Sequence, residues 1–264
     1  VLVKYLRYLP VMEIVFFRNL PIMLIIPFIL KNKKISFWGN NKTLLLLRCL
    51  LSAISVITYF YTITVMILTD AVTIKQLSPF FILILASIFL GEKINYKKIN
   101  IFILAFLGAL FIVKPGFRLD MYPVIIALSG VISTAGSHVA LRNLRLTDHP
   151  LVIVNYFGYI IGLIALGVLL WQGNFIIPDA LSLFVLFLLG FVGLGGQFAL
   201  TKAYQMAPTK LVALYLYLQI IFSTFLGILF FKEIPDIFSI LGASLIIVCG
   251  YLNFKFTKKK EKNV

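Results

Sequence analysis

Charged side chains are scarce in this sequence. Only 12% of its 264 residues are Asp, Glu, Lys or Arg, whereas 61% are hydrophobic. A soluble globular domain typically has about 25% charged residues. So little charge cannot cover the surface of a soluble protein of this length, so lipid must cover it instead. The composition therefore predicts a membrane protein.

Cysteine, histidine and acidic residues are also few. Two cysteines, Cys49 and Cys249, lie in apolar runs of opposite halves, which excludes a disulfide framework and a cysteine metal cluster. The chain has two histidines and no acidic motif with metal-ligand spacing, so we expect no metal, no cofactor and no enzymatic activity. It also has no P-loop, so ATP-driven transport would require another subunit.

Long apolar runs dominate what is present. Nine runs are long enough for membrane-spanning helices, at about 20 residues each: 10–30, 43–67, 70–91, 97–113, 121–142, 150–171, 180–206, 209–231 and 236–256. Most of the connections are only a few residues long. Successive helices are therefore expected to be antiparallel neighbours in an all-α integral membrane protein.

Basic residues gather in the breaks between the apolar runs. This distribution argues against nucleic acid as a partner, despite the net charge of +15. Of the 24 Lys and Arg residues, 17 lie on one side of the predicted membrane and 5 on the other. Because cytoplasmic loops are enriched in basic residues, we expect the first side to be cytoplasmic, including the basic tail at 257–264. This tail is interpreted as a topology anchor beside anionic lipid.

The sequence repeats itself at an offset of about 140 residues. The segment Phe89–Ile94 matches Phe230–Pro235 at an offset of 141, and Pro10 matches Pro150 at an offset of 140. The matches predict two repeats, 1–116 and 117–256. The second repeat has five spans and the first has four, so we expect one helix to be missing at the N-terminus through truncation, a misplaced start or gene decay. Two five-helix repeats would be inverted relative to each other, which is typical of secondary carriers with a substrate site near the membrane midplane.

Several motifs are similar to those of one transporter family. They include Pro10, Glu13, Phe16-Phe17-Arg18, Leu47-Arg48, Leu77-Ser78-Pro79-Phe80 and Leu90-Gly91-Glu92, and in the second half Gly195-Gly196-Gln197, Tyr217-Leu218-Gln219 and Lys232-Glu233-Ile234-Pro235-Asp236. With these motifs the chain resembles the EamA-type carriers of the drug/metabolite transporter superfamily over essentially its whole length. The resemblance implies a ten-helix fold of two inverted repeats around a central cavity. Family members move amino acids, nucleotide-related metabolites, S-adenosylmethionine or drugs, and the pattern looks most like the bacterial branch with S-adenosylmethionine uptake carriers.

Ionisable residues inside the predicted spans are the main candidates for substrate binding, because such residues are costly in a bilayer. Arg18 lies about 12 Å into its span and could pair with a substrate carboxylate or phosphate. Glu13 lies only about 4.5 Å deep, where it binds a proton or a cationic substrate, or is simply solvated. Lys75 and the neighbouring Gln76 precede Ser78-Pro79, where a helix break would line a cavity.

The remaining candidates are amides and phenols that suit a planar or zwitterionic solute, although tyrosines at span ends also act as interfacial anchors. They are Tyr59, Asn155, Tyr156, Gln197, Tyr217 and Gln219. Arg48 and Lys202 lie near the cytoplasmic ends of their spans and are interpreted as snorkelling residues. His138 and the nearby hydroxyl residues are interpreted as helix-packing groups.

Together these patterns predict a secondary transporter of a small organic metabolite, amino-acid-like or nucleotide-like, in the cytoplasmic membrane of a bacterium. Its expected partners are the solute and membrane lipid, and apolar peripheral helices would permit a homodimer. Two alternatives stay open: an intramembrane enzyme acting on lipid-like substrates, and an inactive truncated relic of a carrier.

Overall fold

The structure is a computed structural model of the whole chain. It describes residues 1–75, 77–90, 100–101, 103–104, 107–108, 111, 121–206, 218–232 and 235–261. Contacts divide the chain into two compact units, each combining segments from both halves of the sequence. The Arg18 unit comprises Leu2–Thr64 and Gly136–Met206, and the Lys75 unit comprises Val1, Val65–Ala135 and Ala207–Val264.

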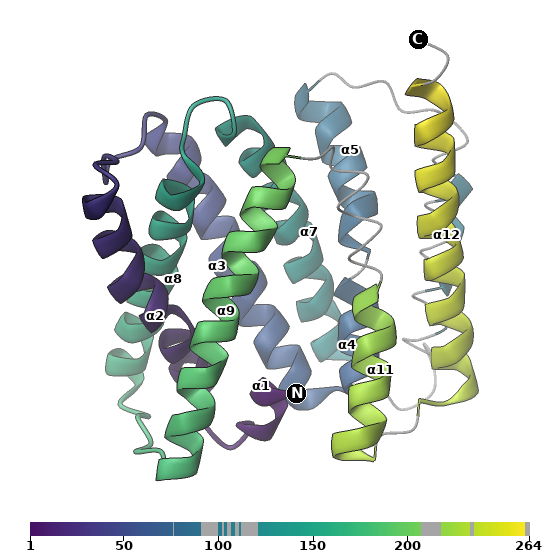
Figure 1. The fold of residues 1–264 in the computed structure, drawn as a ribbon. Coiled ribbons are helices and arrows are strands. Elements are labelled where there is room, and N and C mark those ends of the chain that lie inside the picture. The colour runs from purple at the N-terminus through teal and green to yellow at the C-terminus, as the bar shows by residue number, and fades with distance from the viewer. Residues whose placement is uncertain are drawn as a thin grey trace. The chain divides into compact units, whose positions relative to one another are not determined.

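The described residues form helices and contain no strand, as an all-α membrane protein requires (Figure 1). Five helices are long and apolar enough to cross a membrane: α2 (Val11–Asn32), α3 (Lys42–Val65), α7 (Met121–Leu144), α8 (Pro150–Gln172) and α9 (Ala180–Met206). Their bounds agree with five predicted spans to within a few residues. Most of the predicted span 97–113 and the beginning of 209–231 lie outside the described residues.

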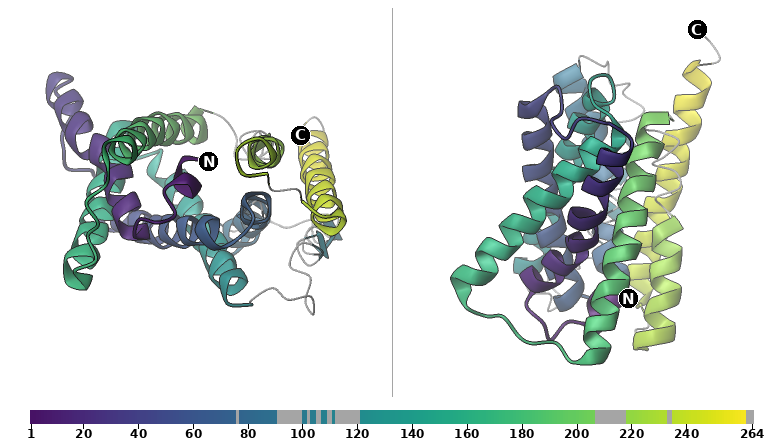
Figure 2. Two further views of the ribbon diagram at one scale, coloured as in Figure 1. Left: turned by 90° about the horizontal axis from the view of Figure 1, so that it is seen from below. Right: turned by 60° about the vertical axis from the view of Figure 1, so that its left-hand side comes forward.

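In the Arg18 unit, α2 packs against both α8 and α9, as the two views of Figure 2 also show. The short helix α1 (Leu2–Tyr5) packs against α9. Helix α8 begins where Nδ1 of His149 accepts a hydrogen bond from the backbone N–H of Leu151, with Pro150 in the first helical position. It ends at Gly173, whose φ of 63° is the left-handed conformation that glycine adopts readily.

Small residues bring α2 close to its two neighbours. On α8, Gly158 and Gly162 face Ile22 and Met23, and a Cβ added at Gly158 would lie 2.3 Å from Ile22. On α9, a Cβ at Gly190 would lie 2.7 Å from the Pro21 ring and 2.9 Å from a backbone carbonyl of α2. Close approach at glycine is the usual way in which helices associate in lipid. The position of α2 is therefore set from two sides.

The prolines of α2 are accommodated by neighbouring helices. Pro27 has no N–H to donate to the carbonyl of Met23, four residues earlier. The hydroxyl of Tyr159 on α8 donates to that carbonyl instead, at 3.1 Å. A side chain from a second helix thus satisfies the backbone group that proline leaves free, as membrane helices require.

One corner of the Arg18 unit is built around the carboxylate of Asp148. It accepts hydrogen bonds from the backbone N–H groups of Asn40, at 2.6 Å, and Asn41, at 3.4 Å. Gly39 is required beside it, since an added Cβ would lie 2.5 Å from the Asp148 carboxylate. The corner joins the α2–α3 connection to the segment between α7 and α8.

In the Lys75 unit, the predicted span 70–91 is two helices rather than one, α4 (Leu68–Lys75) and α5 (Ser78–Leu90). Pro79 explains the interruption, because its ring cannot donate to the carbonyl of Lys75. Helix α4 packs against α11 (Leu218–Phe231) and α12 (Ile237–Glu261). A Cβ added at Gly108 would lie 3.0 Å from the carbonyl of Gly242, so this glycine allows close contact with α12.

Candidate substrate-binding site

Arg18 points into the Arg18 unit and lies against aromatic rings. Its guanidinium carbon is 5.8 Å from the ring centroid of Phe60 on α3 and 5.5 Å from that of Phe157 on α8. Nη1 donates to Oδ1 of the adjacent Asn19 at 3.4 Å. A Cβ at Gly193 would lie 3.1 Å from Cγ of Arg18, so the glycine leaves room for this side chain. The predicted inward orientation of Arg18 agrees with these contacts.

Arg48 is the residue whose interpretation from the sequence was wrong. It was expected to snorkel toward the cytoplasmic end of α3, but it is only 2% exposed. Its guanidinium carbon lies 5.0 Å from the ring centroid of Phe157, and Nη1 donates to the carbonyl of Ile153 at 3.4 Å. The arginine turns inward because α8 offers a ring and a carbonyl within reach. Phe157 thus has both Arg18 and Arg48 on it, and we call these two arginines the guanidinium pair.

The acidic residues of the Arg18 unit are all bonded elsewhere. Asp148 accepts from backbone N–H groups of the α2–α3 connection. Asp179 accepts from the hydroxyl of Tyr8 at 3.1 Å, and Glu13 accepts from a backbone N–H. No acidic side chain among the described residues pairs with the guanidinium pair. Nε of Arg48 is buried and has no hydrogen-bond partner among the described residues.

Glu13 is not solvated, although its shallow position in α2 made that one reading of the sequence. It has no exposed surface. Oε2 accepts a hydrogen bond from the backbone N–H of Ile176 at 3.2 Å, while Oε1 has no partner among the described residues. The connection between α8 and α9 covers the carboxylate, which the sequence could not show because the partner is a backbone group 163 residues away.

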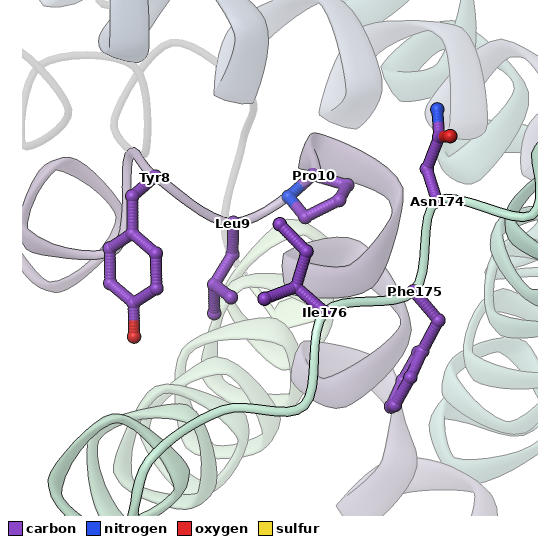
Figure 3. Close-up of a pocket in the computed structure, with 6 residues that line it drawn as sticks. All are labelled: Tyr8, Leu9, Pro10, Asn174, Phe175 and Ile176. Carbon is purple, nitrogen blue, oxygen red and sulfur yellow. The ribbon is translucent and has the colours of Figure 1, made fainter.

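A pocket of about 490 Å³ lies beside this bond, between the segment before α2 and the α8–α9 connection (Figure 3). Tyr8, Leu9 and Pro10 line one side, and Asn174, Phe175 and Ile176 line the other. Figure 3 shows the Ile176 side chain reaching toward Leu9 and Pro10. The pocket is open and contains no charged lining residue, and the backbone N–H of its lining residue Ile176 is the group that binds Glu13.

Asp179 holds the far end of the same connection. Tyr8 donates to its carboxylate and also contacts the hydroxyl of Ser182. The hydrogen bond from Ser182, followed by that from Tyr8, lowers the pKa of the Asp179 carboxyl from its usual value. The contacts of Tyr8 with Asp179 and Ser182 join the segment before α2 to the beginning of α9.

Four other candidates lie in the Arg18 unit. Asn155 is 6% exposed and its Oδ1 has no partner among the described residues. It precedes Gly158 by three residues, so it lies on the side of α8 that faces α2. Gln197 is 8% exposed and follows Gly193 by one turn, on the side of α9 nearest Arg18. Tyr59 and Tyr156 are partly exposed.

The candidates of the other unit are fewer. Lys75 is the last residue of α4 and Gln219 lies in the first turn of α11, and these two helices pack together. Gln76 and Tyr217 lie outside the described residues. The structure therefore neither supports nor contradicts their predicted roles.

The polar residues that were not expected to bind substrate have packing contacts. His138, at the end of α7, contacts Tyr204 of α9, with Nδ1 and the phenol oxygen 3.3 Å apart. Next to it, the hydroxyl of Ser137 lies 2.6 Å from that of Ser52. Lys202 is exposed with Nζ 6.0 Å from the ring centroid of Phe198, which agrees with its interpretation as a snorkelling residue.

Comparison with known proteins decides the class of this apolar helical protein. The model of the EamA-like transporter family matches residues 1–114 and again residues 121–254. The chain belongs to the EamA-like transporter family. It is therefore a multi-pass membrane transporter, as the sequence motifs predicted.

Relatives of this chain differ in the solute and in the direction of transport that their names state. The chain is 35% identical to the pseudopaline exporter CntI of Pseudomonas aeruginosa over 243 residues, covering 91% of this chain and 84% of the relative. It is 28% identical to the S-adenosylmethionine uptake transporter of Rickettsia prowazekii over 251 residues, with 94% and 84% covered. It is 30% identical to mouse solute carrier family 35 member G1 over 262 residues, with 93% and 71% covered. Both an exporter and importers are thus among the relatives.

Proposed function

We propose that this EamA-family transporter moves a small organic metabolite, amino-acid-like or nucleotide-like, across the cytoplasmic membrane by alternating access. The observation that carries the proposal is Arg18, a cation inside a membrane-spanning helix with no acidic partner among the described residues. An uncompensated charge in this position is costly, and this cost favours a functional role. A carboxylate or phosphate of the solute supplies the missing negative charge.

Other residues of the Arg18 unit support the same proposal. Asn155 has a buried amide oxygen that is free to accept a hydrogen bond from a solute ammonium or amide group. Gln197 lies one turn from Gly193, which contacts Arg18. A cation with nearby amides suits a solute that carries both anionic and hydrogen-bonding groups. The C-terminus is proposed to be cytoplasmic, because basic residues are concentrated on that side.

The test is uptake of labelled amino acids and of S-adenosylmethionine into proteoliposomes that contain the purified full chain. We expect saturable uptake of at least one of them, and Arg18→Ala is expected to abolish it while the protein stays in the membrane. Lys202→Ala is the matched control, since this residue is an exposed cation of α9. Wild-type uptake by Arg18→Ala would refute the site, and product formation without vectorial movement would favour an enzyme.

A further inference from the structure

The guanidinium pair contains more positive charge than a single anionic group can neutralise. The guanidinium carbons of Arg18 and Arg48 lie 5.5 and 5.0 Å from the centroid of one ring, that of Phe157. The two carbons are therefore separated by no more than the sum of these distances. Two like charges within that range of each other repel in a low-dielectric interior unless anions lie nearby.

The protein supplies no such anions among its described residues. The three acidic residues of the Arg18 unit are bonded to backbone N–H groups or to a tyrosine hydroxyl. The contacts of the pair include two rings, one amide, one carbonyl and the thiol of the adjacent Cys49, none of which is an acidic side chain. A neutral carbonyl and a ring compensate only part of the desolvation of a buried cation.

The two arginines also differ in how their donors are occupied. Arg18 is partly exposed and its hydrogen bond to Asn19 is long, at 3.4 Å. Arg48 is 2% exposed, and its buried Nε has no partner among the described residues. A guanidinium has five N–H donors in a planar fork that matches a carboxylate. Both side chains therefore have donor capacity that the described protein groups do not use.

We propose that Arg18 and Arg48 form two anionic subsites for one ligand, so that the transported solute is a small organic dianion such as a dicarboxylate. This inference rests on the proposed transport function. Arg18, the more accessible arginine, binds the first anionic group of the solute. Arg48 binds the second group across Phe157, whose ring packs against the carbon chain between them.

The experiment measures binding of matched ligand pairs to the purified full chain. Succinate, glutarate and adipate are each compared with their monoamides, which have the same length and one negative charge fewer. A ligand that binds only the folded protein raises its melting temperature with concentration, and this dependence gives Kd. We expect at least one diacid to bind about tenfold to a hundredfold more tightly than its monoamide, since a charged hydrogen bond is lost.

Three variants assign the subsites. Arg48→Gln is expected to weaken the diacid to about the level of its monoamide and to weaken the monoamide much less. Arg18→Gln is expected to weaken both ligands, and Lys202→Gln, an exposed cation in a neighbouring helix, is expected to change neither. If Arg48→Gln does not fold, Arg48→Lys retains the charge and should keep a reduced preference for the diacid. A purely structural role for Arg48 would weaken both ligands equally, and this result would overturn the proposal.

The binding and uptake experiments test different proposals, because either one can fail while the other succeeds. Equal affinities for every diacid and its monoamide, or no stabilisation by any diacid, would overturn the dianion proposal even in a protein that transports another solute. Conversely, diacid preference that depends on Arg48, in proteoliposomes without any solute movement, would support the two subsites and contradict transport.

Discussion

Two regions of the Arg18 unit show opposite solutions to a charge inside the membrane. The guanidinium pair, Arg18 on α2 and Arg48 on α3, has no acidic partner among the described residues and lies against Phe157 of α8. Near the beginning of α2, Glu13 is a buried acid with no cationic partner among the described residues, and it faces the α8–α9 connection. Glu13 and Arg18 are five residues apart, a rotation of about 140°, so they cannot neutralise each other across one helix face.

The difference lies in what satisfies each charge. One oxygen of Glu13 has a backbone N–H as partner, so this carboxylate is used to hold a connection in place. The guanidinium pair has rings and neutral oxygens around it, and the described residues leave part of its capacity to donate to an anion unused. Glu13 thus anchors a connection, whereas the guanidinium pair is proposed to bind a ligand. Changes in these two regions should have effects of different size, of which the largest is expected at Arg48.

Charge reversal at Arg48 replaces one of the two cations of the guanidinium pair with an anion. In Arg48→Glu the new carboxylate lies close to Arg18 and binds its guanidinium in place of a ligand. We expect the affinity for the preferred diacid to fall by about a hundredfold or more, as both subsites are lost. Titration of the melting temperature with that diacid measures the loss. Lys202→Glu makes the same change at an exposed position, and an equal loss there would show that only overall charge matters.

Two glycines of α9 allow the packing of α2 to be tested separately from the surroundings of the Arg18 side chain. In Gly190→Ala the added Cβ meets the Pro21 ring and a backbone carbonyl, neither of which can move aside, and we expect a loss of about 1–3 kcal/mol in unfolding free energy. In Gly193→Ala the Cβ meets the flexible Arg18 side chain at 3.1 Å. This variant should lose ligand affinity with little loss of stability. Equilibrium unfolding in detergent and diacid titration of both variants test the distinction.

Substitutions of Glu13 are expected to have a smaller effect on the stability of the fold. Glu13→Gln keeps an oxygen that accepts from the N–H of Ile176 and removes a buried charge, so we expect stability to be unchanged or slightly raised. Glu13→Ala loses the acceptor and should cost about 1 kcal/mol. Hydrogen exchange of the N–H of Ile176, measured by NMR, should increase only in Glu13→Ala. Faster exchange in both variants would show that the charge itself is required.

The smallest effect is expected at Asp179, which is fully exposed. Its pKa is lower in the folded protein, so its hydrogen bonds stabilise the fold above the usual carboxyl pKa. This contribution is lost as the pH falls through the lowered value. We therefore expect the wild-type melting temperature to fall slightly more than that of Asp179→Asn between pH 7 and pH 3. Parallel falls in the two proteins would show that the tie to Tyr8 has no measurable role.

The sequence predicted the helices of this protein better than their contacts. Apolar length and charged breaks placed α2, α3, α7, α8 and α9, because lipid requires long continuous apolar helices. The same reasoning predicted that Arg18 faces inward, since it is too deep to reach water. Pro79 indicated a local break in the span 70–91, and the structure divides this span into two helices.

Partners far apart in the sequence could not be predicted in the same way. Arg48 lies near the beginning of α3, and nothing near it in the sequence indicates the carbonyl of Ile153, 105 residues later. Glu13 looked solvated for the same reason, since its partner is a backbone group of the α8–α9 connection. Phe157 is one of 25 phenylalanines, so its contact with two arginines has no distinguishing sequence signal.

The separation between Arg48 and its partners has a consequence for how the protein is made. Helix α3 leaves the ribosome and enters the membrane before α8, which carries both Ile153 and Phe157, has been synthesised. During that interval Arg48 has neither contact, and a charged side chain within a membrane helix is costly. Its long side chain can reach the nearby interface until α8 arrives. The final inward position of Arg48 is therefore a late step of biogenesis, reached only when the second half of the chain is inserted.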